Sequence, residues 1–259
     1  MPIGKLVAPA PEDQSPMCQC LSRRALLALP VSLSLTQNDR PIEPHMRLPN
    51  APADRLTVAL TLDACPGGFD ERIANALVAA RIPATIFITG VWLRQNPNGL
   101  AFLLAHRDLF AIENHGEWHT PPVLGVGQMF GIPIAGNLAA IQREVQQGAA
   151  SIAAATGATP TWYRASTGYY SPSAIPVIQQ LGFGIAGYSL NADAGASLPA
   201  HSVAHRIAAA ISGDVIVAHI NQPTRPSGAG VVAGIQELQR RSANFVRLDQ
   251  LATTQLMSA

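Results

Sequence analysis

From about residue 54 onward, short apolar runs alternate with stretches of helical periodicity, and this alternation restricts the fold more than any other feature. It is typical of a strand-helix repeat, which forms a mainly parallel sheet. Seven strand-helix units over about 200 residues predict an α/β fold with one closed or nearly closed barrel. The predicted strands cover residues 56–63, 84–89, 109–114, 161–164, 183–189, 214–219 and 245–248. The predicted helices cover 70–81, 91–106, 137–156, 172–181, 200–212 and 230–242.

The composition fits a globular domain. Of the 259 residues, 48% are apolar and 13% are charged, which supports a well-filled core. The net charge is +1 and the basic residues are scattered, so we expect no binding to nucleic acid. The three cysteines, Cys18, Cys20 and Cys65, neither build a disulfide framework nor complete a four-thiolate zinc site. Nothing in the sequence indicates an oligomeric state.

An arginine pair precedes a short apolar stretch near the N-terminus. The segment from Ser22 to Leu35 resembles a bacterial twin-arginine export signal, with an amphipathic helix as the alternative. We therefore predict an export signal over 1–35, a linker over 36–53 and a periplasmic or secreted protein. No later segment reaches ~18 apolar residues, so no membrane-spanning segment is expected in the mature chain.

Chemically useful residues follow the predicted strands at their C-terminal ends, where barrel enzymes carry their catalytic groups. One of them, His115, precedes His119 by four residues, and the two imidazoles could converge on one divalent cation and leave it open to substrate. An aspartate at a neighbouring strand end makes a metal-assisted hydrolase the leading hypothesis. The strand-end residues are Asp63, His115, Arg164, the segment 191–193 and His219.

Five short motifs, in this order, resemble those of polysaccharide deacetylases of carbohydrate esterase family four. The resemblance covers roughly residues 56–251. It implies a distorted seven-stranded (β/α) barrel, with a catalytic domain over 54–259 that removes N- or O-acetyl groups from a cell-wall or extracellular glycan. The motifs are Thr61-Leu62-Asp63-Ala64-Cys65, His115-Gly116-Glu117-Trp118-His119, Trp162-Tyr163-Arg164, Asn191-Ala192-Asp193 and Val217-Ala218-His219.

The resemblance also implies a divalent metal, with zinc as the first choice and cobalt, nickel or manganese as alternatives. His115 and His119 would bind it. The family's third protein ligand, a second aspartate in the first motif, is replaced here by Ala64. Asp63 could then double as a ligand, Asp70 could approach, or the site could work without a tightly held metal. Asp70 fits better as the N-cap of a helix.

Catalytic roles follow from the same resemblance. Asp63 would be the general base, and Arg164, held by Asp193, would keep it ionised. His219 would protonate the leaving group. The backbone N–H of Thr167 would bind the oxyanion. Trp118 and Tyr169 are predicted to contact the substrate.

Three alternatives stay open. His201 and His205 match the family's second motif more literally, but they lie in a predicted helix and out of chain order. The long Gly- and Pro-rich loop at 121–135 could be a lid or a substrate platform. The domain could also be a metal-dependent amidase for a small acylated molecule, or an inactive barrel that binds glycan. Retention of both Asp63 and His219 argues against the inactive barrel.

Overall fold

The computed structural model describes residues 39–52 and 54–251. The predicted export signal lies outside these residues. Within them, no helix is both long and apolar enough to cross a membrane.

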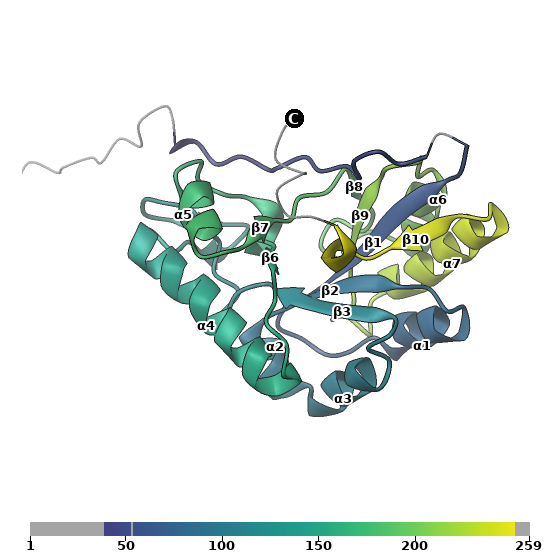
Figure 1. Cartoon of the computed structure of the whole chain (residues 1–259), viewed down its shortest axis with the longest axis horizontal. Coiled ribbons are helices and arrows are strands. Elements are labelled where there is room, and N and C mark those ends of the chain that lie inside the picture. The colour runs from purple at the N-terminus through teal and green to yellow at the C-terminus, as the bar shows by residue number, and fades with distance from the viewer. Residues whose placement is uncertain (1–38, 53, 252–259) are drawn as a thin grey trace, which may run out of the picture. The chain divides into compact units, whose positions relative to one another are not determined.

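A curled parallel sheet forms the framework, and it confirms the predicted barrel-type α/β fold (Figure 1). Seven strands follow the order β7-β6-β3-β2-β1-β9-β8, and β10 pairs with the start of β1. The sheet is a half-barrel, because the strands at its two ends do not pair with each other. The strands are β1 (Thr57–Ala64), β2 (Ala84–Ile88), β3 (Phe110–Asn114), β6 (Trp162–Tyr163), β7 (Gly184–Ile185), β8 (Leu190–Asn191), β9 (Val215–His219) and β10 (Asn244–Val246).

Helices separate most successive strands of the main sheet, close to their predicted positions. They are α1 (Glu71–Ala79), α2 (Gly90–Gln95), α3 (Pro97–Ala105), α4 (Leu138–Thr156), α5 (Ala174–Gln180), α6 (Ala200–Ala208) and α7 (Ser227–Arg240). The predicted helix 91–106 is two helices, because Pro97 has no N–H to continue the first and instead begins the second. The predicted strand 183–189 is likewise divided into β7 and β8.

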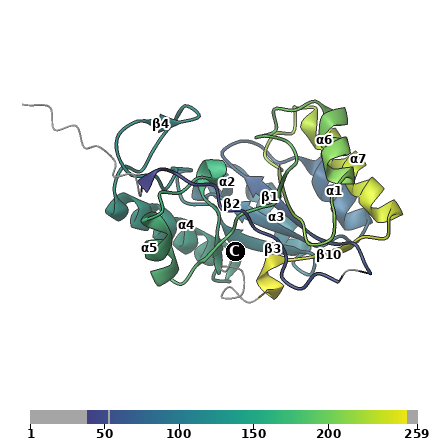
Figure 2. The ribbon, with the colours of Figure 1, turned by 90° about the horizontal axis from the view of Figure 1, so that it is seen from above.

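The predicted loop 121–135 contains a small antiparallel hairpin of β4 (Gln128–Met129) and β5 (Ile132–Pro133). Figure 2 shows this hairpin projecting beyond the neighbouring helices. Its tip residue, Phe130, is 76% exposed. Such exposure of a large apolar side chain is compatible with contact to a ligand.

Strand alternation divides β1 between two environments. Leu60, Leu62 and Ala64 pack in the main core against the helices. The intervening residues face the inside of the half-barrel, where Ala59 packs with Phe87 and Trp162. Because β9 repeats this alternation in register with β1, Asp63 lies beside His219 on the inner face. The sheet therefore carries its polar groups on the inside, at the C-terminal ends of the strands.

Residues 39–52 are packed on the domain and do not form a separate linker. Met46 donates a backbone hydrogen bond to Tyr188, in the connection between β7 and β8, and Leu48 donates one to Gly213. The side chains of Met46 and Leu48 are buried in the same cluster as the interior residues of the half-barrel. The described part of the predicted linker thus covers the gap between the sheet's two ends.

Candidate active site

A cavity of about 800 Å³ opens at the C-terminal ends of the central strands. Its volume is in the range of small-molecule sites, and polar groups from several strands converge in it. Six of the sequence-predicted site residues line it together with Cys65, namely Asp63, His115, His119, Thr167, Tyr169 and His219.

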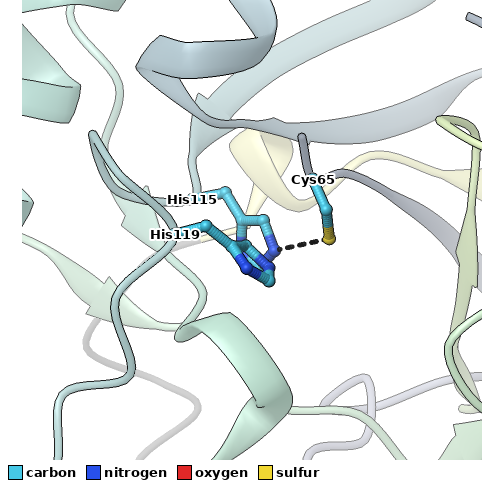
Figure 3. Close-up of side chains that lie close together, drawn as sticks. All are labelled: Cys65, His115 and His119. Carbon is cyan, nitrogen blue, oxygen red and sulfur yellow. Dashed lines mark hydrogen bonds between the residues drawn. The ribbon is translucent and has the colours of Figure 1, made fainter. Parts of the chain in front are cut away.

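Three side chains of metal-binding type meet in this cavity (Figure 3). One potential ligand atom each from Cys65, His115 and His119 lies within 4.8 Å of the others. The Cys65 Sγ is 3.4 Å from Nε2 of His115. Burial opposes ionisation of the Cys65 thiol, but the neighbouring His119 and His115 outweigh it and hold its pKa well below the usual value. The thiol is therefore poised to be a thiolate.

His115 is oriented by the backbone at its other ring nitrogen. Its Nδ1 lies 2.9 Å from the carbonyl oxygen of Arg164. A carbonyl oxygen only accepts hydrogen bonds, so Nδ1 must carry the proton and donate it. In the neutral imidazole, the form that binds a metal, this leaves the lone pair of Nε2 directed at the cavity.

His119 is held in place by a buried carboxylate. Its backbone adopts a left-handed φ of 65°, which is unfavourable for a residue with a side chain. Glu144 of α4 accepts hydrogen bonds from the backbone N–H groups of Trp118 and Thr120 on either side of it. His119 Nε2 is buried and has no hydrogen-bond partner among the described residues. The strained loop thus presents an unsatisfied nitrogen to the cavity.

Asp63 forms a buried ion pair. Its Oδ1 accepts a 2.9 Å hydrogen bond from Nη1 of Arg164, which also donates to Thr61 Oγ1. Its Oδ2 lies 3.9 Å from Nε2 of His115. Burial alone would raise the pKa of Asp63, but the charges of Arg164, His115 and His219 outweigh it and lower that pKa. The carboxylate is therefore ionised and available as a proton acceptor.

Asp193 does not hold Arg164, and this part of the predicted ion network is wrong. Its Oδ1 lies 2.9 Å from His219 Nδ1, and its Oδ2 accepts the backbone N–H of His219. The reason is topological, because Asp193 follows β8, which pairs with the strand that carries His219. Arg164 instead donates to backbone carbonyl oxygens of Ala186 and Gly187.

The contact with Asp193 sets the charge of His219. Burial lowers the pKa of His219, but the Asp193 carboxylate outweighs that effect and raises the pKa well above its usual value. Since Nδ1 faces the carboxylate, Nε2 is the nitrogen left to act in the cavity. An imidazolium at this place is a suitable general acid near neutral pH.

Of the predicted oxyanion and substrate residues, two line the cavity and one does not. Thr167 and Tyr169 line the cavity, and the Tyr169 ring contacts Phe130 of the hairpin at 6.0 Å between centroids. Trp118 is not among the lining residues. It is 60% exposed, and its ring lies 4.9 Å from the guanidinium of Arg94.

The alternative ligands are occupied or distant from the cluster. Asp70 caps α1 and pairs with Arg72, which confirms its predicted N-cap role. Ala64 is buried in the core between sheet and helices. His201 and His205 are exposed on α6, away from the group formed by the other two histidines.

Sequence reasoning missed Cys65 as a member of the site. The signal was its position, two residues after Asp63, which places both side chains on the same face of an extended chain. Sequence reasoning also missed Glu144, which supports the loop around His119. No local motif could reveal it, because Glu144 is 26 residues after Trp118 in the chain.

Comparisons with known proteins agree with this geometry. The chain matches the family model described as polysaccharide deacetylase over residues 50–186. No curated protein sequence gives a significant match.

Several solved structures share the fold. A family 4 carbohydrate esterase from Streptomyces lividans is 20% identical, with 79% of this chain and 97% of that chain covered and a TM-score of 0.62. The Bc1960 peptidoglycan N-acetylglucosamine deacetylase is also 20% identical, with 77% and 89% covered and a TM-score of 0.64. BA3943, a CE4 family pseudoenzyme from Bacillus anthracis, is 18% identical, with 80% and 67% covered and a TM-score of 0.63.

Proposed function

This chain belongs to the polysaccharide deacetylase family, and on that premise we propose that it is a metal-dependent hydrolase that removes acetyl groups from a cell-wall or extracellular glycan. The observation that carries the proposal is the pairing of Asp63 with His219. The two residues are register partners on adjacent strands and line one cavity. One is held as a carboxylate and the other as an imidazolium, which supplies a base and an acid for acyl transfer to water.

The residues fit a divalent cation. The donor set is rich in nitrogen and sulfur, and the orphaned Nε2 of His119 is a buried polar atom that a cation would satisfy. His115 and His119 would hold the ion. A cation bound there would polarise the acyl carbonyl and acidify a water molecule.

The protein's own groups divide the proton transfers. Asp63 accepts the proton of the attacking water, and the guanidinium of Arg164 keeps the carboxylate ionised and aimed. His219 then donates a proton from Nε2 to the leaving amine or hydroxyl, while Asp193 fixes the imidazole through Nδ1. Thr167 lines the cavity, and its backbone N–H would stabilise the oxyanion.

One observation favours a second candidate, an inactive glycan-binding barrel. Ala64 stands where the family has a metal ligand, and the pseudoenzyme BA3943 is among the similar folds. The intact Asp63–Arg164 and His219–Asp193 pairs support activity instead, because glycan binding requires neither a base nor an acid.

Acetate release from a panel of acetylated glycans, with and without a chelator, tests the proposal. We expect release from at least one glycan, its loss on chelation and its recovery with zinc. His115→Ala should lose most turnover and bound metal, whereas the control His205→Ala, at an exposed position on α6, should change neither.

Other outcomes would contradict the proposal in distinct ways. Acetate release that is insensitive to chelator would exclude metal dependence. Hydrolysis confined to small acylated amides would favour an amidase. Glycan binding without any acetate release would favour an inactive barrel.

Asp193→Asn is expected to move the alkaline limit of turnover to lower pH. Removing the carboxylate removes the charge that raises the pKa of His219, so the imidazolium loses its proton at lower pH. An opposite charge at this distance is worth about 1–3 pKa units, which sets the size of the shift. The pH dependence of turnover measures it, with Asp108→Asn, at an exposed carboxylate, as the control. An unchanged alkaline limit would mean that His219 is not the acid.

A further inference from the structure

We propose that the thiolate of Cys65 is the third protein ligand of the metal, in place of the aspartate that Ala64 has replaced; this inference rests on the proposed metal-dependent function. The argument starts with the direction of the strand. Ala64 packs in the core between sheet and helices, and its methyl group offers no donor atom to the cavity. Cys65 is the next residue, and it lines the cavity with Asp63.

The spacing of the ligand atoms fits a tetrahedral ion. Zinc lies about 2.3 Å from sulfur and about 2.0–2.1 Å from nitrogen, which places the two ligand atoms about 3.5 Å apart at tetrahedral angles. The separation between Cys65 Sγ and His115 Nε2 is 3.4 Å. Figure 3 shows the thiol and the two imidazoles converging from the end of β1 and from the loop after β3.

A second observation is independent of the cysteine. Nε2 of His119 is buried without a hydrogen-bond partner among the described residues, and Nε2 of His115 presents its lone pair to the same space. Buried polar atoms in folded proteins rarely lack a hydrogen-bond partner, and a bound ligand would supply the missing one. The unsatisfied nitrogen points to a ligand shared with Cys65.

The neighbouring carboxylates are not available as the third metal ligand. Asp63 directs Oδ1 to Arg164, and its remaining oxygen is needed as the base. Asp70 is engaged on both oxygens by Arg72. Within the described residues, the group of close metal-binding atoms comprises a thiol and two imidazoles and includes no carboxylate.

A thiolate ligand changes which metals the site prefers. Thiolate and imidazole ligands suit zinc and other late transition metals, whereas carboxylates and water suit magnesium and manganese. We therefore expect this site to discriminate against manganese more strongly than one with an aspartate ligand.

Cobalt binding to the full chain, without substrate, tests the inference directly. Co²⁺ added to the metal-free protein should give a sulfur-to-cobalt charge-transfer band in the near ultraviolet. The band should vanish in Cys65→Ser. The control variant, with both Cys18→Ser and Cys20→Ser, should retain it, because it keeps Cys65, which lines the cavity.

Affinity and selectivity provide a second measurement. Loss of the thiolate should weaken zinc binding by on the order of 10–100-fold, at least the effect of losing an outer-shell partner. Cys65→Asp should recover binding without the band and shift the preference toward manganese. The recovery guards against misfolding of the serine variant.

The inference would be overturned by a charge-transfer band that persists in Cys65→Ser, or by unchanged zinc affinity in that variant. An acetyl group trapped on Cys65 during turnover, seen by mass spectrometry, would instead make the thiol a nucleophile. Because metal binding is measured without substrate, a protein that shows the band but releases no acetate would retain the ligand assignment and lose the proposed function.

Discussion

Replacing Asp63 with Asn is expected to lower turnover by on the order of 10²–10⁴ and to affect substrate affinity much less. An amide cannot accept the proton of the attacking water. The change is nearly isosteric, and the cavity wall stays in place. Comparison of kcat and KM for the two proteins measures the effect.

The matched control is Asp108→Asn, which removes an exposed carboxylate paired with Arg81 and should leave both constants unchanged. The bound metal should also be measured in Asp63→Asn. Retention of metal together with lost turnover would separate the base from the ligands. If Asp63→Asn turns over nearly as fast as the unaltered protein, the assignment of Asp63 as the base is wrong.

The second large effect concerns Arg164, whose replacement by Met should reduce the free energy of unfolding by about 3–5 kcal/mol. The side chain is completely buried, and its guanidinium lies 4.2 Å from the centroid of the Phe87 ring. Methionine fills part of the volume but leaves the Asp63 carboxylate without its partner. Urea denaturation at neutral pH measures the loss, with Arg240→Met, at an exposed ion pair, as the control.

The pH dependence of that loss has a definite sign. In the unaltered protein the folded-state pKa of Asp63 is lowered, so its contribution to stability is present above the unfolded pKa and is lost as pH falls. Without Arg164, burial raises that pKa, and protonation then favours the folded state. The deficit of Arg164→Met should therefore shrink on acidification. A deficit that grows on acidification would show that the ion pair does not control Asp63.

Much of the fold could be predicted because strand-helix alternation is local. Apolar runs placed β1, β2, β3 and β9 within two residues of their observed bounds. The prediction fails for elements whose secondary structure depends on long-range contacts. The two-residue strand β8 exists through its pairing with β9, and no residue pattern of its own distinguishes it from a loop.

The same distinction applies to the site. Strand-end position was enough to single out Asp63, His115 and His219, which do share one cavity. Strand-end position did not reveal which of these residues pair with one another. The residue that faces Arg164 depends on which strands are neighbours in the sheet. Matching the first motif position by position drew attention to Ala64, whereas the face on which each side chain lies would have drawn it to Cys65.

The packing of residues 39–52 limits how far the chain can be trimmed. Ile42 exchanges backbone hydrogen bonds with Tyr170, and Met46 and Leu48 fill the interior between the two ends of the sheet. Proteolytic maturation that cut beyond Ile42 would begin to strip this cover, and a cut after Leu48 would open the inside of the half-barrel to water. A trimmed chain that keeps residues 39–52 is therefore expected to retain a covered interior.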